Sequence, residues 1–236
     1  MPPIIPIIIP IWFYGFDAVM YMISSLIGFL LSFYFHKIYS ISSEKRHLYL
    51  FWGFLILSFG LLNLSIIDAY SYTTFWQCKP LCNLGILDQT FDIGSFSYFL
   101  YFGLSIIAYA LLMMAYIPQK FKIPNLPIWL LSIYFLVILI TLPLRSGEIV
   151  WYSYSIFFDL IAFLMMIFIS FINFINFNEN KSIEPLIVTM SFFFLSLFHL
   201  IHIFSSISGW MYVYAHVSML ISFILLLSVV IKVKKK

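Results

Sequence analysis

The chain has 236 residues, of which 64% are hydrophobic and only 9% charged, and its mean hydropathy is +1.07. A soluble domain has about 25% charged residues and roughly half apolar residues, so the composition excludes a soluble enzyme domain, a disordered chain and a disulfide scaffold. The formal net charge of +3 lies in loops and a basic tail, and it gives no basic soluble face for nucleic acid.

Seven apolar runs are separated by clusters of charge, Pro and Gly. A membrane-spanning helix needs about 20 apolar residues, which six of the runs approach or exceed, while the fourth is the shortest. The sequence therefore predicts an all-α integral membrane protein, a seven-helix bundle that forms one domain over residues 1–236. The predicted spans are residues 11–35, 48–67, 96–117, 128–144, 149–171, 185–204 and 210–231.

The distribution of Lys and Arg predicts the orientation, because these residues accumulate in cytoplasmic loops. With the N-terminus outside and the C-terminus in the cytoplasm, ten of these residues lie inside and only two, Lys79 and Arg145, lie outside. We therefore expect a multi-pass protein of the cell membrane with this topology. Small residues in the first span, Ser25, Gly28 and Ser32, predict close packing of that helix against a neighbour.

The longest predicted loop, residues 68–95, lies on the outer side and contains the only two cysteines, Cys78 and Cys82. On an oxidising side of the membrane, a local disulfide between them is the simplest interpretation. The spacing Cys-x-x-x-Cys also resembles the copper-binding pair of Sco-type copper chaperones and of the binuclear copper centre of cytochrome oxidase. In those families a nearby His completes the soft ligand set that suits copper, whereas this loop contains no His and no Pro follows Cys82.

Ionisable residues inside a membrane span are costly, and they mark candidate functional sites. Asp17 lies roughly 9 Å below the outer boundary and Asp159 about 15 Å below it, near the middle of the bilayer, at 1.5 Å per residue of helix. No Lys or Arg reaches Asp159 at that depth. We therefore expect Asp159 to be protonated, hydrogen-bonded to Tyr or Ser, or facing water or His.

Three histidines lie in the last two spans, which form a helical hairpin that turns at residues 205–209. His199 and His216 are equally far from the turn, so they lie at the same depth in an antiparallel pair. His202 shares a helix face with His199, and Tyr212 shares one with His216. If the bundle closes into a ring, Asp17 joins this layer from the first helix, and His199, His216, Asp17 and His202 become candidate metal ligands, with Asp159 and Tyr212 as further members of the site.

Three functions remain open from these residues. The favoured one is a non-enzymatic membrane module that binds or senses a proton, a metal or a small ligand at the Asp/His layer near the outer face, and that acts through a partner subunit in the bilayer, because histidine titrates in the range of such switches. A second is a redox subunit of a membrane complex that binds haem b between His199 and His216, or copper. Adjacent helices 8–10 Å apart leave little room for a porphyrin ring.

The third function is a zinc-dependent intramembrane hydrolase, since three His and an acid suit a catalytic zinc ion with an open position. In its helix number and ligand type the chain resembles the alkaline ceramidases and the adiponectin-receptor-like proteins. That family has an H-x-x-x-H pair in its last helix, whereas this chain has His199 and His202 three residues apart and a single His216. The resemblance therefore implies a type of ligand set and assigns no individual residue.

Overall fold

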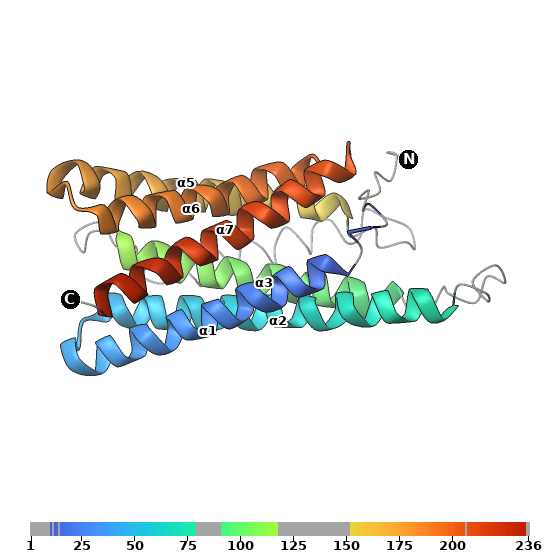
Figure 1. The fold of residues 1–236 in the computed structure, drawn as a ribbon, viewed down its shortest axis with the longest axis horizontal. Coiled ribbons are helices and arrows are strands. Elements are labelled where there is room, and N and C mark those ends of the chain that lie inside the picture. The colour runs from blue at the N-terminus through green and yellow to red at the C-terminus, as the bar shows by residue number, and fades with distance from the viewer. Residues whose placement is uncertain are drawn as a thin grey trace, which may run out of the picture.

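The computed structural model describes residues 10, 12–13, 15–78, 91–117, 152–205 and 207–234. Within these ranges the chain forms six helices and no strand (Figure 1). They are α1 (Phe16–Ser42), α2 (Lys45–Cys78), α3 (Phe91–Tyr116), α5 (Tyr152–Asn180), α6 (Ile183–Ile203) and α7 (Gly209–Lys234).

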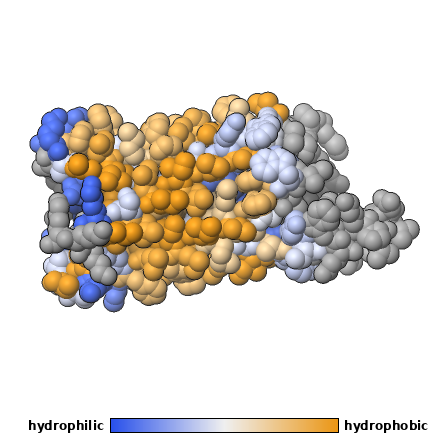
Figure 2. All heavy atoms as spheres, in the orientation of Figure 1, coloured by the Kyte–Doolittle hydropathy of each residue, from blue (hydrophilic) through white to orange (hydrophobic). Residues whose placement is uncertain are grey.

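Five of these helices, α1, α2, α5, α6 and α7, are long and apolar enough to cross a membrane, and α3 contains a shorter apolar segment, Leu100–Tyr116. Apolar side chains form a broad band across the middle of the face that Figure 2 shows. Many of them are large and exposed, such as Phe33, Leu164 and Phe171. An apolar belt of this kind is stable in lipid and not in water, so the composition and the fold agree on a helical membrane protein.

The helices contact one another in sequence around a closed ring, from α1 to α2, α3, α5, α6, α7 and back to α1. α1 and α2 run antiparallel, as the hydrogen bonds from Ser65 to the carbonyl of Ala18 and from Ser32 to that of Phe51 show. By contrast, α1 and α7 are parallel. The closed ring of helices, on which the predicted site depended, is therefore present among the described helices.

Small residues allow the close approach of α1 and α2. The Ser25 hydroxyl donates to the carbonyl of Ser58 at 2.9 Å, and a Cβ at Gly28 would meet the Ser58 side chain. This geometry confirms the close packing predicted from the small residues of the first span.

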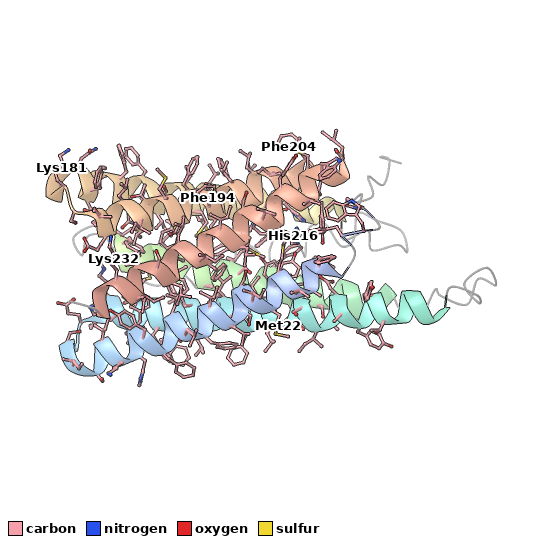
Figure 3. All side chains as sticks on the ribbon, in the orientation of Figure 1. Met22, Lys181, Phe194, Phe204, His216 and Lys232 are labelled. Atoms are coloured by element: carbon pink, nitrogen blue, oxygen red, sulfur yellow. The ribbon has the colours of Figure 1, made fainter. Side chains whose placement is uncertain are left out.

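The described Lys and Arg side chains gather at one end of the bundle, together with Glu44, Glu179 and Glu184. Every described Lys and Arg lies at the end where α1, α3, α5 and α7 finish: Lys37, Lys45, Arg46, Lys181, Lys232 and Lys234. Lys181 and Lys232 mark this end in Figure 3, and Phe204 marks the opposite one. Three aspartates, Asp17, Asp68 and Asp159, lie toward the end that carries no described Lys or Arg; we call it the acidic end.

Several predicted boundaries differ from the structure. The second helix continues to Cys78 and the third begins at Phe91, so the predicted loop 68–95 is shorter than expected and Asp68 is helical. α1 and α5 continue beyond their predicted ends, to Ser42 and Asn180. The predicted fourth span, 128–144, lies outside the described residues.

Candidate functional site

The first cluster of polar side chains centres on Asp159 of α5. Its Oδ1 accepts a hydrogen bond from His199 Nδ1 at 2.8 Å, and its Oδ2 accepts one from His202 Nδ1 at 2.7 Å. His199 and His202 lie three residues apart on one face of α6, so that a single carboxylate reaches both. We call Asp159, His199, His202 and Tyr109 the Asp159 network.

The geometry of the Asp159 network determines which of its atoms carry a hydrogen and donate. An ionised carboxylate only accepts, so each imidazole donates from Nδ1. The Nε2 of His199 therefore accepts from the Tyr109 hydroxyl of α3, 2.8 Å away. Asp159 is 2% exposed and His199 is fully buried, whereas the side chain of His202 is 12% exposed. His202 is thus the most exposed of these three side chains.

The second cluster lies where α1 begins beside α7. Asp17 Oδ1 accepts from the backbone N–H groups of Gly15 and Ala18 at 3.0 and 2.9 Å, and its Oδ2 accepts from the Tyr212 hydroxyl at 2.9 Å. An anion is favoured at a helix N-terminus, where backbone N–H groups and the positive end of the helix dipole face it. Gly15 makes the turn into the helix with φ of 96°, a conformation that other residues rarely adopt.

His216 belongs to this second cluster through both of its nitrogens. Its Nδ1 donates to the backbone carbonyl of Tyr212 at 2.8 Å, which fixes Nε2 as the acceptor of the Tyr21 hydroxyl, also at 2.8 Å. Two hydrogen bonds therefore join α1 and α7 one helical turn apart. Tyr212 donates to Asp17, and Tyr21 donates to His216. We call Asp17, Tyr21, Tyr212 and His216 the Asp17 network.

Aromatic rings lie between the two networks. The ring of Phe198 is 4.7 Å from that of His199 and 5.9 Å from that of His216, centroid to centroid. The ring of His202 is 6.0 Å from that of Tyr212 and 6.4 Å from that of His216. His202 therefore contacts the Asp17 network through its ring while it bonds to Asp159.

A third acid lies on α2 at the same end. One oxygen of Asp68 is 3.5 Å from the Tyr98 hydroxyl, and the other is buried without a hydrogen-bond partner in the described part of the chain. Nearby, the amide of Asn63 exchanges hydrogen bonds with Ser97 of α3. All six described helices thus contribute polar side chains toward the acidic end.

The structure brings the predicted site residues together in two groups instead of one. His199 and His202 join Asp159, while Asp17, Tyr212 and His216 join one another. The prediction that His199, His216 and Asp17 share one bound atom receives no support from these contacts. Asp159, predicted near mid-bilayer, pairs with His202, which lies in the last turn of α6 and thus close to the acidic end.

The geometry does not favour the predicted metal and haem ligands. Both nitrogens of His199 and both of His216 already make hydrogen bonds, which a metal would have to displace. Among the described residues no group of three His, Cys, Asp or Glu side chains is placed to hold a metal ion. The predicted disulfide and copper pair involves Cys82 and the side chain of Cys78, which lie outside the described residues.

The site contains two tyrosines, Tyr21 and Tyr109, that the sequence analysis did not identify. The signal for Tyr21 was its position one turn after Asp17, matching the one-turn spacing of Tyr212 and His216. The signal for Tyr109 was a polar stripe on α3, since Tyr101, Ser105 and Tyr109 follow at steps of four.

No protein-family model matches this chain, and no curated protein or solved structure is similar to it.

Proposed function

We propose that this chain is a membrane module that takes up and releases a proton at the Asp159 network and passes the resulting change to a partner membrane protein. The observation that carries the proposal is the pairing of both Asp159 oxygens with imidazole Nδ1 atoms at 2.8 and 2.7 Å. Histidine is the side chain that changes charge near neutral pH, so a carboxylate between two histidines suits proton exchange.

The charge of the Asp159 network changes with a single proton. With both imidazoles neutral, Asp159, His199 and His202 together carry one negative charge. A buried, uncompensated charge costs several kcal/mol, and no described Lys or Arg lies at this end to compensate it. One additional proton on His202 makes the network neutral, so the fold stabilises the protonated form.

Other polar groups face His202 and Asp159 from the neighbouring helices. Tyr109 of α3 reaches the network through His199, and Tyr212 and His216 of α7 contact the ring of His202. A proton gained at His202 therefore acts on contacts that hold α3, α5, α6 and α7 together. A shift in these contacts is the signal that a partner in the bilayer would receive.

The orientation belongs to the same proposal. The described Lys and Arg gather at one end, which supports placing that end in the cytoplasm of the cell membrane and the N-terminus outside. α3 and α5 each run antiparallel to α6. Tyr109 and Tyr116 of α3 contact His199 and Phe192 of α6, and Asp159 and Ser170 of α5 bond to His202 and Thr189 of α6. α3 and α5 therefore run parallel. A seventh span at residues 128–144 would supply the crossing that a parallel pair requires.

Proton uptake by the purified protein in lipid nanodiscs tests the proposal. We expect a pH jump to give proton uptake and infrared difference bands of the Asp159 carboxylate and its imidazoles, and we expect the uptake to fall and these bands to be lost in Asp159→Asn and in His202→Gln. His36→Gln is the matched control, because His36 is an exposed imidazole near the opposite end of α1. Equal uptake in the wild type and in Asp159→Asn would contradict the proposal.

A further inference from the structure

The first and last helices diverge toward the acidic end. A Cβ on Gly28 of α1 would lie 3.5 Å from the ring of Phe223, so α1 and α7 touch near their middles. In Figure 1, α7 begins beside the end of α6, apart from the start of α1, and crosses toward α1 as it runs to the opposite end. Because protein interiors are closely packed, side chains have to fill the space between the first turns of the two helices.

Phe13, which precedes α1, fills this space. It is 3% exposed, and its ring lies 6.0 Å from that of Tyr212 and 5.9 Å from that of His216, centroid to centroid. With Tyr212 and Val213 it forms a small hydrophobic cluster that is distinct from the main core of the bundle. A side chain with so few buried apolar neighbours can leave its place while the main core stays intact.

The backbone beside Phe13 lies on the surface and turns at Gly15. Trp12 packs on Trp210 of α7 with ring centroids 5.6 Å apart, and both side chains are exposed. Gly15 has φ of 96°, and a Cβ at this position would lie 3.1 Å from the ring of Tyr72. Glycine meets both demands, and it is the residue about which a backbone pivots most easily.

Asp17 holds this stretch of chain against both helices. Its Oδ1 accepts from the backbone N–H groups of Gly15 and Ala18, and its Oδ2 accepts from the Tyr212 hydroxyl of α7. One carboxylate therefore fixes the turn before α1, the first turn of α1 and the first turn of α7. Its removal frees all three together.

We propose that Trp12, Phe13 and Gly15 form a lid over the Asp17 network. Phe13 closes the space between α1 and α7, Gly15 is the pivot, and Asp17 holds the lid shut. When the lid swings outward, Val213 and His216 become accessible to water from the acidic end. The lid covers the second network, and it does not rest on the proposed proton exchange at Asp159.

Cysteine labelling of the full-length protein in nanodiscs tests the lid, in a background where Cys78 and Cys82 are replaced by Ser. Val213→Cys places a thiol in the cluster beneath Phe13. Ala215→Cys is the matched control, because Ala215 is also buried on α7 but belongs to the main core. With a charged methanethiosulfonate that does not enter lipid, we expect Val213→Cys to react faster than Ala215→Cys, because the lid opens. Equal rates at the two positions would overturn the proposal.

Two further variants distinguish an opening lid from a fixed crevice. Phe13→Ala empties the space and Asp17→Ala removes the group that holds the lid shut, so we expect each to raise the Val213→Cys rate by about tenfold or more. Phe16→Ala is the matched control, since this exposed ring stacks on that of Phe13 outside the cluster, and we expect it to change the rate by less than about twofold.

The Ala215→Cys rate reports whether each variant keeps its main core. We expect that rate to stay at its wild-type value in Phe13→Ala and in Asp17→Ala. If Asp17→Ala raises it, Phe13→Ala decides alone, because that variant keeps the hydrogen bonds of Asp17. A Val213→Cys rate that does not change in Phe13→Ala would show that Phe13 is not a lid.

Discussion

Asp159 is a buried carboxylate that accepts hydrogen bonds from two imidazoles, one at each oxygen. Its replacement by Ala leaves two buried N–H donors without an acceptor. Asn retains one oxygen, and its amide N–H faces the second imidazole, which changes tautomer to accept it. The two replacements therefore separate the loss of charge from the loss of hydrogen bonding.

We expect Asp159→Ala to lower the free energy of unfolding by about 3–5 kcal/mol, the range for breaking a buried ion pair. Asp159→Asn is expected to cost about 1–3 kcal/mol, the range for one imperfectly satisfied buried group. Ser170→Ala is the control, because it removes one hydrogen bond between the same two helices and is expected to cost about 0.6 kcal/mol. Reversible unfolding in mixed micelles measures all three, and an Asp159→Ala loss as small as that of Ser170→Ala would contradict this prediction.

At this scale, the identities of the polar residues were predictable and their pairing was not. Asp17, Asp159, His199, His202, His216 and Tyr212 stood out because ionisable groups are rare in apolar runs. Which acid pairs with which histidine depends on helix rotation, and that is set by packing. Tyrosine gave a weak signal, since the chain has 16 of them and an aromatic belt accounts for many, so Tyr21 and Tyr109 were missed.

Among the helices, the apolar runs located every described helix but not its ends. An apolar run in the sequence ends where the chain leaves the membrane, whereas a helix continues until a capping residue or a helix-breaking residue ends it. α2 therefore extends from Lys45 to Cys78, well beyond its apolar run, and α1 ends only at Ser42, where Ser43 turns with φ of 55°. The small residues of α1 predicted its close packing correctly, because short side chains allow a neighbouring helix to approach closely, whichever helix that is.

Gly28 allows the packing of α1 against α2 to be tested. A leucine at this position has to displace the Ser58 side chain, and this separates α1 from α2 and weakens the hydrogen bond from Ser25 to the carbonyl of Ser58. We expect Gly28→Leu to lower the free energy of unfolding by about 1–3 kcal/mol, as overpacking does.

The control for Gly28→Leu is Val19→Leu, which changes an exposed position on the same helix and is expected to alter stability by less than about 0.5 kcal/mol. Cross-linking of cysteines introduced at Ser25 and Ser58 reports the helix separation directly. Equal cross-linking yields in the wild-type and Gly28→Leu backgrounds would show that the interface accommodates the larger side chain.

For the whole molecule, the gathering of the described Lys and Arg at one end was predictable from the sequence, because it depends only on the order of loops and spans. The closed ring was not, because it depends on contacts between α1 and α7, which lie at opposite ends of the chain. The parallel course of α1 and α7 has a further consequence. Asp17 and His216 lie at the same end because each lies near the start of its helix and the two helices are parallel, so the Asp17 network depends on the course of α1 and α7.

The orientation prediction follows from this link between topology and site. We expect Ser208→Cys, in the turn between α6 and α7, to react with a membrane-impermeant maleimide added outside intact cells, in a background where Cys78 and Cys82 are replaced by Ser. Ser182→Cys, in the turn between α5 and α6, is expected to react only after the cells are opened, because Lys181 and the other described cations lie on that side. The two turns flank the same helix, so they must label oppositely if α6 spans the membrane. Labelling of Ser182→Cys alone from outside would place the acidic end, and with it the Asp159 network, on the cytoplasmic side.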